Sequence, residues 1–325
     1  MPTNQDLKIL QNLSLDIKIE KSKLRIREWY NHFCGDVYVS FSGGKDSTVL
    51  KHLVESTVGE VPSVFCDTGL EYPEIKDFVK SQNNVTIIRP EISFKTVITE
   101  YGYPVISKEV SGRINGARLC IKYGDGRYQW AYDMFTKGGY DGRKSAFYDL
   151  RRYEYMLNAP FKISNRCCDI MKKKPFHNYE KLTGCKGFLG TMAIESNLRM
   201  QSWIKNGCNA FNITYPHSAP LSFWTEQDIL EYLYTYKIPY CSVYGEIVKK
   251  ADGSYVTTGL NRTGCMFCMY GISQDGEINR FQRMQHTHPK IYDYCMKALE
   301  QGGLGLKEVL SFMNIPYEDN QLYIE

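Results

Sequence analysis

A short glycine turn between an apolar run and an amphipathic segment is the part of the sequence best suited to bind an anion. Residues 42–47 read Ser-Gly-Gly-Lys-Asp-Ser; the β-rich run 37–41 precedes them, and apolar residues at helical spacing follow. Paired glycines let the backbone turn tightly, so that successive N–H groups at a helix N-terminus point at one spot. A Walker A loop would need glycine at position 39 and serine or threonine at position 46, where the chain has Val39 and Asp46. We therefore predict a phosphate-binding loop of another type, with an ordinary strand–turn–helix corner as the alternative.

Two pairs of cysteines form a second candidate site. Cys167 and Cys168 are adjacent, and Cys265 and Cys268 form a Cys-x-x-Cys motif that begins 97 positions after Cys168. If the fold brings the pairs together, four thiolates suit either zinc or an iron–sulfur cluster. Neighbouring side chains diverge, which makes a tandem pair awkward for tetrahedral zinc, and free thiols are the third alternative. Two further cysteines could replace a ligand: Cys185 and Cys208.

Alternating strand and helix patterns indicate how the phosphate loop is positioned. Apolar runs at 61–65, 85–88 and 187–191 follow the run at 37–41, with helical patterns after residue 46 and around 74–80. This order predicts an α/β fold with a parallel sheet flanked by helices and joined by right-handed crossovers. Ligands of such sheets lie beyond the carboxyl ends of the strands, which places Asp67, Thr68 and Gly69 on the same rim as residues 42–47.

The remaining patterns outline the domains. We expect an N-terminal helical segment at 1–35, a nucleotide-binding domain at 36–245 with a basic insertion at about 101–166, and a C-terminal region at 246–325 with helices. The Gly-, Arg- and Tyr-rich stretch 112–142 has no clean period and is expected to be irregular, and 245–264 is expected to be a loop. Thr225 and Asp228 form a capping-box pattern, so a helix is expected to begin there.

Whole-chain properties narrow the class of protein. The 325 residues contain no run of about 18 apolar residues, and the first six lack the features of a signal peptide. We therefore expect a cytoplasmic protein that makes no use of a membrane. Eleven cysteines, an odd number in a chain of this length, do not indicate a disulfide framework, and in a reducing compartment clustered thiols more often bind metal or carry out redox chemistry.

The positive charge is concentrated in one segment. Net charge is +4, but between residues 101 and 166 twelve Lys or Arg stand against six Asp or Glu, and the segment holds nine of the 25 tyrosines. Basic residues interleaved with aromatic ones are typical of surfaces that bind phosphates and stack bases. The insertion therefore predicts a DNA or RNA partner, with a solvated helical face and half-buried tyrosines as the alternative.

The phosphate loop resembles the pyrophosphate loop of the ATP pyrophosphatases, which cleave ATP between the α- and β-phosphates. With Asp-Thr-Gly at 67–69 and Tyr-Pro-Glu at 72–74, it resembles the phosphoadenosine-phosphosulfate reductase family of the adenine nucleotide alpha-hydrolase superfamily. Further blocks follow in the same order to about residue 270, among them Gly-Thr-Met-Ala at 190–193 and Ile-Pro-Tyr at 238–240. The resemblance implies a nucleotide site formed by Ser40, Phe41, Ser42, Gly43, Gly44, Lys45, Asp46, Ser47, Asp67, Thr68, Gly69, Gly190, Glu195 and Arg199.

The two cysteine pairs resemble those of the cluster-bearing branch of this family, which implies a [4Fe–4S] cluster on Cys167, Cys168, Cys265 and Cys268. Sulfonucleotide reductases also carry a C-terminal Glu-Cys-Gly-(Leu or Ile)-His motif, whose cysteine attacks the sulfate sulfur. No cysteine follows Cys295 in this chain, so that nucleophile is missing. A cluster without the reductase tail is similar to the thiolating relatives, such as the DNA phosphorothioation sulfurtransferases and, more distantly, the tRNA thiolases.

The resemblance implies an ATP-dependent sulfurtransferase that adenylates an acceptor, with DNA or RNA as the expected acceptor. Lys45 would neutralise phosphate charge, Asp46 would order the loop or hold Mg²⁺, Asp67 would make a second magnesium or water contact, and Arg199 would be the second cation. Expected cofactors and partners are ATP or an adenylylated nucleotide, Mg²⁺, a cysteine desulfurase or other sulfur donor, and further copies of the chain in a homo-oligomer. Two alternatives remain: a sulfonucleotide reductase that uses an external thiol, and a non-enzymatic sensor that binds nucleotide and cluster.

Overall fold

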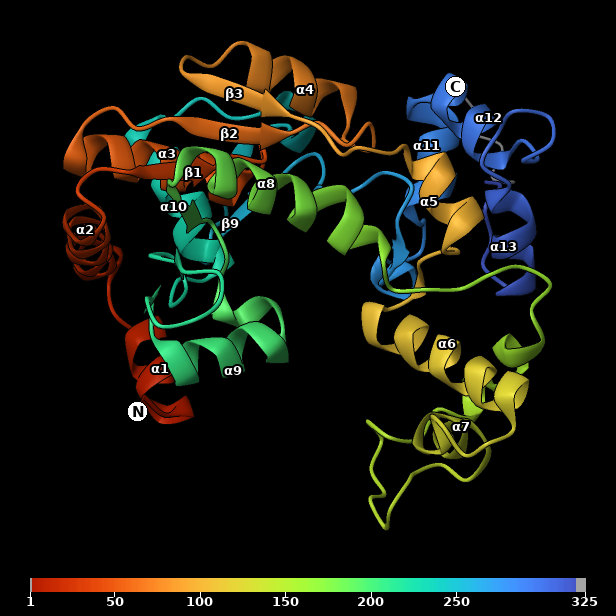
Figure 1. Ribbon diagram of the computed structural model, residues 1–325. Helices are drawn as coiled ribbons and strands as arrows, with labels where there is room; N and C mark the ends of the chain where they lie inside the picture. Colours follow the sequence, from red (N-terminus) through yellow and green to blue (C-terminus); the bar gives the residue numbers. More distant parts are fainter. Residues whose placement is uncertain (1, 320–325) are drawn as a thin grey trace. The chain divides into compact units, whose positions relative to one another are not determined.

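The computed structural model describes residues 2–319, which divide into two compact units (Figure 1). Unit 1 comprises the residues up to Pro90 together with Lys173–Gly264. Unit 2 comprises Glu91–Lys172 and the residues from Cys265 onward. Each unit is therefore built from two separate stretches of the chain. The expected insertion, 101–166, lies in unit 2 together with both cysteine pairs.

Unit 1 contains a six-stranded sheet, as the alternating pattern predicted. The strands in spatial order are β3 (Val85–Ile88), β2 (Ser63–Cys66), β1 (Val37–Ser40), β5 (Lys186–Leu189), β7 (His217–Ser218) and β6 (Asn209–Ala210). All neighbouring pairs are parallel except β6 and β7, which are antiparallel. The α/β class with a mainly parallel sheet is thus confirmed.

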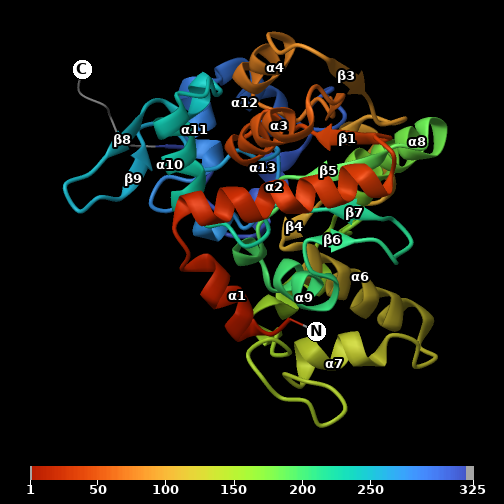
Figure 2. The same ribbon diagram turned by 90° about the vertical axis from the view of Figure 1, so that its left-hand side faces the viewer.

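Helices cover both faces of this sheet, because successive residues of a strand point to opposite sides. On β1, Val37 and Val39 belong to the apolar core that also includes α3 (Lys45–Val58), and α3 packs on α2 (Leu15–His32) and α10 (Glu226–Tyr236; Figure 2). Tyr38 between them faces α8 (Lys174–Thr183), where its hydroxyl donates to Glu180 at 2.8 Å. The remaining elements of unit 1 are α1 (Asn4–Gln11), α4 (Pro73–Lys80), η3 (Ala193–Glu195), α9 (Asn197–Asn206), η4 (Ser242–Tyr244), β8 (Ile247–Lys249) and β9 (Tyr255–Thr257).

Unit 2 is mainly helical, and two segments far apart in the sequence meet in it. Strand β4 (Val105–Ile106) pairs in parallel with β10 (Met269–Tyr270), and Tyr103 forms a parallel bridge to Ile163. The helical elements are α5 (Phe94–Glu100), α6 (Lys108–Tyr123), α7 (Gln129–Thr136), η1 (Arg151–Asn158), η5 (Ile272–Gln274), α11 (Arg280–Thr287), α12 (Pro289–Met296) and α13 (Leu306–Phe312). The π-helix η2 (Asp169–Lys173) follows the first cysteine pair and leads into α8.

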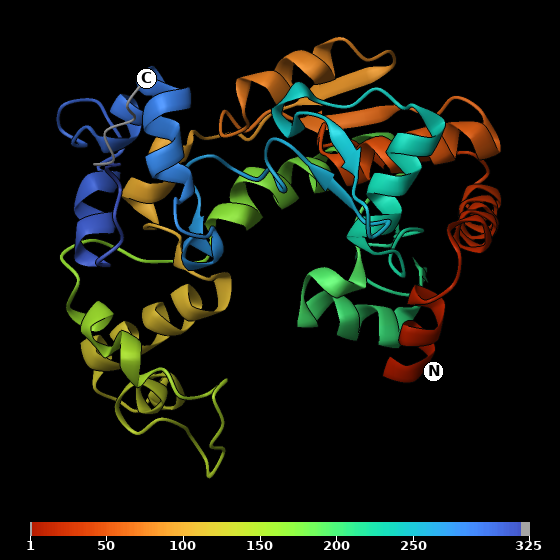
Figure 3. The same cartoon turned by 180° about the vertical axis from the view of Figure 1, so that it is seen from behind.

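Two local expectations from the sequence were wrong. The stretch 112–142 is not irregular throughout, because it contains most of α6 and all of α7 (Figure 3). Glycine lowers helix propensity by about 1 kcal/mol, but Gly116 lets α6 and α7 approach closely: a Cβ placed on it would lie 3.2 Å from the Cβ of Ala131. The expected loop at 245–264 contains the antiparallel hairpin of β8 and β9.

The predicted start of a helix after Thr225 is confirmed. The Thr225 side chain accepts from the backbone N–H of Asp228, and the Asp228 carboxylate accepts from the backbone N–H of Thr225 at 2.6 Å. Among residues 2–319, no helix combines the length and apolar character that a membrane crossing requires.

Candidate functional site

The phosphate loop is held by its own serines. The Ser47 hydroxyl donates to the carbonyl of Gly44 at 2.9 Å and accepts from the backbone N–H of Ser42 at 3.1 Å. The Ser42 hydroxyl lies 3.1 Å from that of Ser47 and accepts from the N–H of Gly44 at 3.3 Å. Gly44 is the N-cap of the 14-residue helix α3, so the positive end of this helix opens directly from the loop.

Three glycines around the loop leave little room for a side chain, and Gly43 also needs a left-handed backbone conformation. Gly43 has φ +72°, and a Cβ there would lie 2.8 Å from the side chain of Val79. Gly190, which follows β5, would place a Cβ 3.2 Å from the backbone of Asp46. A Cβ on Gly44 would come within 3.3 Å of the Ser42 and Tyr244 hydroxyls. The structure therefore places Gly190 against the loop; its role in nucleotide binding remains what the resemblance implies.

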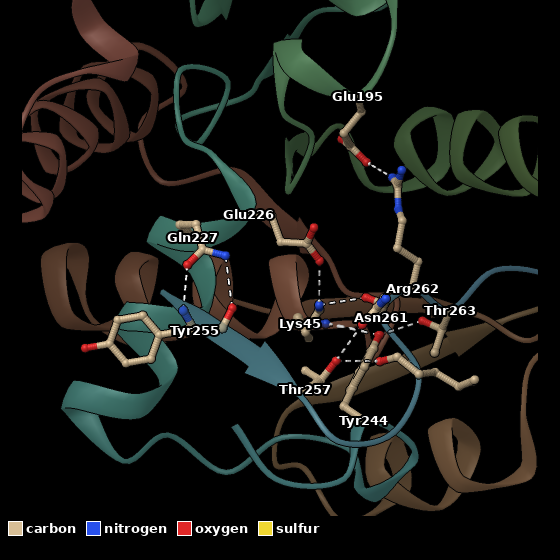
Figure 4. A network of polar contacts seen from close by, with 11 residues as sticks. Lys45, Glu195, Glu226, Gln227, Tyr244, Tyr255, Thr257, Asn261, Arg262 and Thr263 are labelled. Atoms are coloured by element: carbon tan, nitrogen blue, oxygen red, sulfur yellow. Dashed lines mark hydrogen bonds and ion pairs between the residues drawn. The ribbon is translucent and has the colours of Figure 1, made fainter. Parts of the chain in front are cut away.

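The lysine of the loop is buried and positioned by residues from distant parts of the chain. Lys45 is 5% exposed; its ammonium donates to Glu226 Oε1 at 3.0 Å and to the carbonyl of Asn261 at 2.7 Å (Figure 4). It also lies 5.2 Å from the centre of the Tyr244 ring. The Tyr244 hydroxyl accepts weakly from the backbone N–H of Lys45 at 3.4 Å and lies 2.6 Å from the hydroxyl of Thr263. A fixed cation therefore lies beside the loop.

Glu195 joins two arginines at the edge of the same site. Its carboxylate accepts from Arg262 at 2.5 Å (Figure 4). It also accepts from Arg199, one helical turn later, and from the backbone N–H of Met192 at 2.8 Å. The Glu195 side chain is only 10% exposed, whereas those of Arg199 and Arg262 are 43% and 66% exposed. Two guanidinium groups are thus positioned by one buried carboxylate while part of each stays accessible to an anion.

Asp46 is the carboxylate whose protonation is most strongly affected by this site. Burial is the largest cause and the negative charge of Glu195 the next, and together they raise the pKa of Asp46 to about 6 although Lys45 and Arg262 act in the opposite direction. The negative charge of Glu226 also acts to raise the pKa of Asp46, so these two carboxylates lie within electrostatic range of each other. Perturbed carboxylates beside fixed cations are typical of functional sites.

We expect Asp46→Asn to stabilise the free protein at neutral pH. The native state holds a proton on Asp46 up to about pH 6 whereas the unfolded chain releases it near pH 4, so the free energy of unfolding falls as pH rises through this window. An uncharged amide avoids this cost, and the expected gain is about 1–2 kcal/mol at about pH 8, shrinking toward pH 4.5. Denaturant unfolding of both proteins at the two pH values measures it; a variant less stable than wild type at pH 8 would contradict the prediction.

The residues at the carboxyl ends of β1 and β2 lie at the same edge of the sheet, as the order of strands and helices predicted. Ser40 is the last residue of β1, and the N–H of Phe41 donates to Val64 of β2 at 2.9 Å. The side chain of Phe41 belongs to the apolar core, so it is not available to contact a ligand. Asp67 follows β2 directly.

The acidic rim residues are already engaged by other side chains. Asp67 pairs with Lys76 at 2.8 Å and with Arg89 at 3.4 Å; partial burial acts to raise the pKa of Asp67, but hydrogen bonding from Lys76 and its charge outweigh it and lower this pKa. Thr68 donates its hydroxyl to Glu71 at 2.6 Å, and Gly69, at φ +78°, donates its N–H to Asp67 at 3.2 Å. A ligand that uses Asp67 would therefore compete with Lys76.

Sequence reasoning missed part of this site. Arg262 was not identified, and Glu226 and Asn261 were given no role, because their partners are 67, 181 and 216 positions away in the chain. One signal was present: Arg262 stands three residues before the Cys-x-x-Cys motif. Pairing over such distances follows from the folded structure alone.

The two cysteine pairs lie near each other in unit 2. Tyr103 pairs with residues 162–164 and Ile106 with residue 271, so the segment 103–106 brings both pairs together. Burial, followed by the charges of Cys168, Cys265 and Cys268, raises the pKa of Cys167 far above its usual range. Burial and then the charge of Cys265 raise the pKa of Cys268 to about 12. Cys185 and Cys208 belong to unit 1, whereas this group belongs to unit 2.

Two observations bear on whether the four cysteines could hold a metal centre. Among residues 2–319, no three His, Cys, Asp or Glu side chains are arranged as ligands of one metal ion. The donor set of four thiols is nevertheless that of an iron–sulfur cluster. The hydroxyl of Tyr270, whose pKa is raised by burial and by the Cys168 charge, is buried with no hydrogen-bond partner.

The Tyr270 hydroxyl lies within electrostatic range of the Cys167, Cys168 and Cys268 thiols and beside the Ser111 hydroxyl, which can itself accept a hydrogen bond. Ser111, its polar neighbour, already donates to the carbonyl of Val105 at 2.6 Å and accepts from the Val105 N–H at 3.0 Å. Buried hydroxyls are costly to leave unpaired, so a group with acceptor atoms fits this place. The four thiols are therefore chemically suited to hold an iron–sulfur cluster, although they are not arranged as ligands of one metal ion.

A parallel α/β sheet that presents a glycine loop, a helix N-terminus and fixed cations at the carboxyl ends of its strands defines a nucleotide-binding protein. The chain belongs to the phosphoadenosine phosphosulfate reductase domain family, whose model matches residues 36–109 and 128–270. These stretches contain the phosphate loop, the Glu195 cluster and both cysteine pairs. The name of the family model refers to an adenine nucleotide, phosphoadenosine phosphosulfate.

Two curated relatives come from Methanocaldococcus jannaschii. The chain is 22% identical to the uncharacterized protein MJ0973 over 302 residues and 23% identical to the uncharacterized protein MJ0066 over 290 residues. The matches cover 90% and 85% of this chain but 56% and 44% of the relatives, so the chain spans about half the length of the curated relatives it matches. Among solved structures, phosphoadenylyl-sulfate reductase from Candida auris in complex with phosphate is 15% identical with a TM-score of 0.37, covering 74% of this chain and 91% of the other.

Proposed function

We propose that this protein uses ATP to adenylate an acceptor and then transfers sulfur to it, with a nucleic acid as the acceptor and a [4Fe–4S] cluster on Cys167, Cys168, Cys265 and Cys268. The observation that carries the proposal is the cationic phosphate site. A glycine loop at a helix N-terminus lies beside the buried ammonium of Lys45 and the accessible guanidinium groups of Arg199 and Arg262. Such a site suits a leaving pyrophosphate better than a single phosphate.

In the first step an oxygen of the acceptor attacks the α-phosphorus of ATP, and the bond to the β-phosphate breaks. Backbone N–H groups of the loop and the Ser42 and Ser47 hydroxyls would hold the departing pyrophosphate, and Lys45 would offset its growing charge. Arg199 and Arg262 would contact its outer oxygens as a pair. Mg²⁺ would arrive with ATP, because it is usually held by substrate phosphates and one or two carboxylates, here Asp46 and Asp67.

In the second step a sulfur nucleophile displaces AMP from the acceptor. A cluster on the four cysteines would supply bound sulfur at the sulfide level for this displacement. The cysteines themselves would hold that group in a buried place, and the unpaired hydroxyl of Tyr270 would donate a hydrogen bond to it. A cysteine desulfurase or another sulfur donor would restore the sulfur after each turnover.

A second candidate is reduction of an adenylylated or phosphoadenylylated sulfate by an external thiol. Family membership favours it, because the family model carries the name of that reaction. The two candidates share the nucleotide site and differ in what becomes of ATP.

The test is release of pyrophosphate and AMP from ATP in the presence of candidate acceptors. We expect release to depend on an added nucleic acid and to require Lys45, and we expect sulfur from a labelled donor to appear in the acceptor. Thiol-dependent formation of sulfite from adenylyl sulfate, without use of ATP, would support the reductase instead. Nucleotide binding with neither reaction would indicate a sensor.

A further inference from the structure

The turn between α6 and α7 presents aromatic rings to solvent. All ten residues from 121 to 130 are exposed, and they include Tyr123, Tyr128 and Trp130. The Arg127 guanidinium lies over the Tyr123 ring, 4.3 Å from its centre, and the Lys122 ammonium lies 5.8 Å from the same ring. Of the ten exposed aromatic side chains in residues 2–319, six fall between residues 101 and 155.

Local geometry fixes this exposed turn. Tyr128 adopts φ +62°, an unfavourable conformation for a bulky residue, and is the N-cap of α7. Arg127 is held by Asp125, which accepts from its Nε at 2.7 Å and from its backbone N–H at 3.0 Å. Gly124 ends α6 in the left-handed conformation. A defined turn thus connects the two packed helices α6 and α7, which Figure 1 shows side by side.

A second aromatic group continues the surface after α7. The Trp130 and Tyr140 rings are 6.0 Å apart, and Tyr140 and Tyr148 meet edge to face at 5.4 Å. Tyr148 lies 5.0 Å from Phe147, which is 51% exposed. Arg143 donates to the Tyr140 hydroxyl at 3.0 Å. We call the following residues the aromatic platform: Tyr123, Arg127, Tyr128, Trp130, Tyr140, Arg143, Phe147 and Tyr148.

The charge around the platform identifies its ligand. Residues 113–153 contain nine Lys or Arg and four Asp or Glu, a net +5. A net charge of +5 around exposed rings, with guanidinium groups against two of the rings, favours a polyanion as the partner. A nucleic-acid duplex offers phosphates but keeps its base faces stacked inside. Exposed rings with arginines beside them match a strand whose bases are unpaired.

We propose that the aromatic platform binds a single-stranded stretch of nucleic acid, with bases stacked on Tyr123 and Trp130 and phosphates on the neighbouring arginines. This rests on the proposed function and deepens it, because it names a single strand as the form in which the acceptor is held. The family model leaves out residues 110–127, which carry Tyr123 and Arg127. The platform is therefore partly built from a segment outside the family match.

Trp130 supplies a direct readout of stacking. It is 44% exposed, whereas the other three tryptophans are buried at 0%, 5% and 0%, for Trp29, Trp203 and Trp224. Adding a 20-nucleotide oligothymidylate or oligouridylate at about 50 mM salt is expected to quench the tryptophan emission, and Trp130→Phe is expected to abolish the quenching. Tyr123→Ala with Trp130→Ala is expected to weaken binding by at least about tenfold, since each stacked base contributes about 1–3 kcal/mol.

Controls separate this proposal from general charge and from the proposed function. Tyr234→Ala, an exposed ring on α10 of unit 1, is expected to leave binding unchanged, and a duplex of equal length is expected to bind at least about tenfold more weakly. Equal affinity for duplex and single strand, or no quenching at all, would overturn the platform. If a single strand binds and quenches but no pyrophosphate is ever released, the platform stands and the proposed function fails. Pyrophosphate release that depends on a duplex nucleic acid, with no binding of a single strand, would overturn the platform and leave the proposed function standing.

Discussion

Lys45→Ala is expected to weaken binding of Mg-ATP by more than about tenfold and to abolish pyrophosphate release. The Lys45 ammonium is buried and is fixed by Glu226 and the Asn261 carbonyl, so it needs little reorganisation to neutralise a phosphate. Without the Lys45 ammonium, the carboxylates of Glu226 and Asp46 would make the net charge of the site more negative. A tenfold loss corresponds to 1.4 kcal/mol, and calorimetry with Mg-ATP measures it.

A matched control exists on the same helix. Lys51 is also buried, at 8% exposure, and pairs with Glu55 one turn later on α3, away from the loop. Lys51→Ala is therefore expected to change the free energy of unfolding without changing ATP affinity. Comparable losses of affinity in both variants would mean that Lys45 acts through the stability of α3, and unchanged affinity in Lys45→Ala would remove the phosphate site from the proposal.

The sheet and the loop could be predicted from sequence because both are local patterns. Strand β3 was expected at 85–88 and lies at Val85–Ile88, and α3 begins at Lys45, one residue before its expected start. An apolar run, a glycine turn and a capping residue each specify structure within a few residues. The carboxyl-end rule then places residues 42–47 and 67–69 on one edge without further information.

The cation cluster could be predicted only in part. Glu195 and Arg199 are one helical turn apart, and a resemblance identified them, but the role of Arg262 depends on a contact 67 positions away. The helices at 112–142 were missed because glycine lowers local helix propensity, whereas contact between α6 and α7 compensates for it. Contacts between distant segments, rather than local preference, decide both cases.

The cysteine group, too, could be predicted from the sequence only in part. The two pairs can be recognised in the sequence, but their meeting depends on the segment 103–106. Within it, β4 pairs with β10, and Tyr103, just before β4, bridges to Ile163. Strands of two residues leave almost no pattern in a sequence. The structure therefore adds the proximity that a four-thiol site requires, and it leaves the arrangement of the thiols around a metal as a prediction.

Protein purified without oxygen is expected to be brown, with broad absorption near about 400 nm and about four irons per chain. Cys268→Ser is expected to bleach the protein and remove most of the iron, because three thiolates hold a four-iron cluster poorly. Iron analysis and absorption spectra measure this directly, with no need for activity. The loss of colour would be close to complete, which makes it the largest effect expected for any single substitution outside the phosphate loop.

Cys295→Ser provides the control for this experiment. Cys295 lies on α12 of unit 2 and is fully buried, and burial alone raises the pKa of its thiol, without the neighbouring thiol charges that act on Cys167. The Cys295→Ser protein is expected to lose some core packing but to keep its iron. A colourless Cys268→Ser protein and a brown Cys295→Ser protein would therefore assign the cluster to the four-thiol group. Zinc at one equivalent with no iron would instead assign that group to zinc, and iron unaffected by Cys268→Ser would place the cluster on other residues. In either case the sulfur step would need a different source, while the phosphate site, which lies in unit 1, would be unaffected.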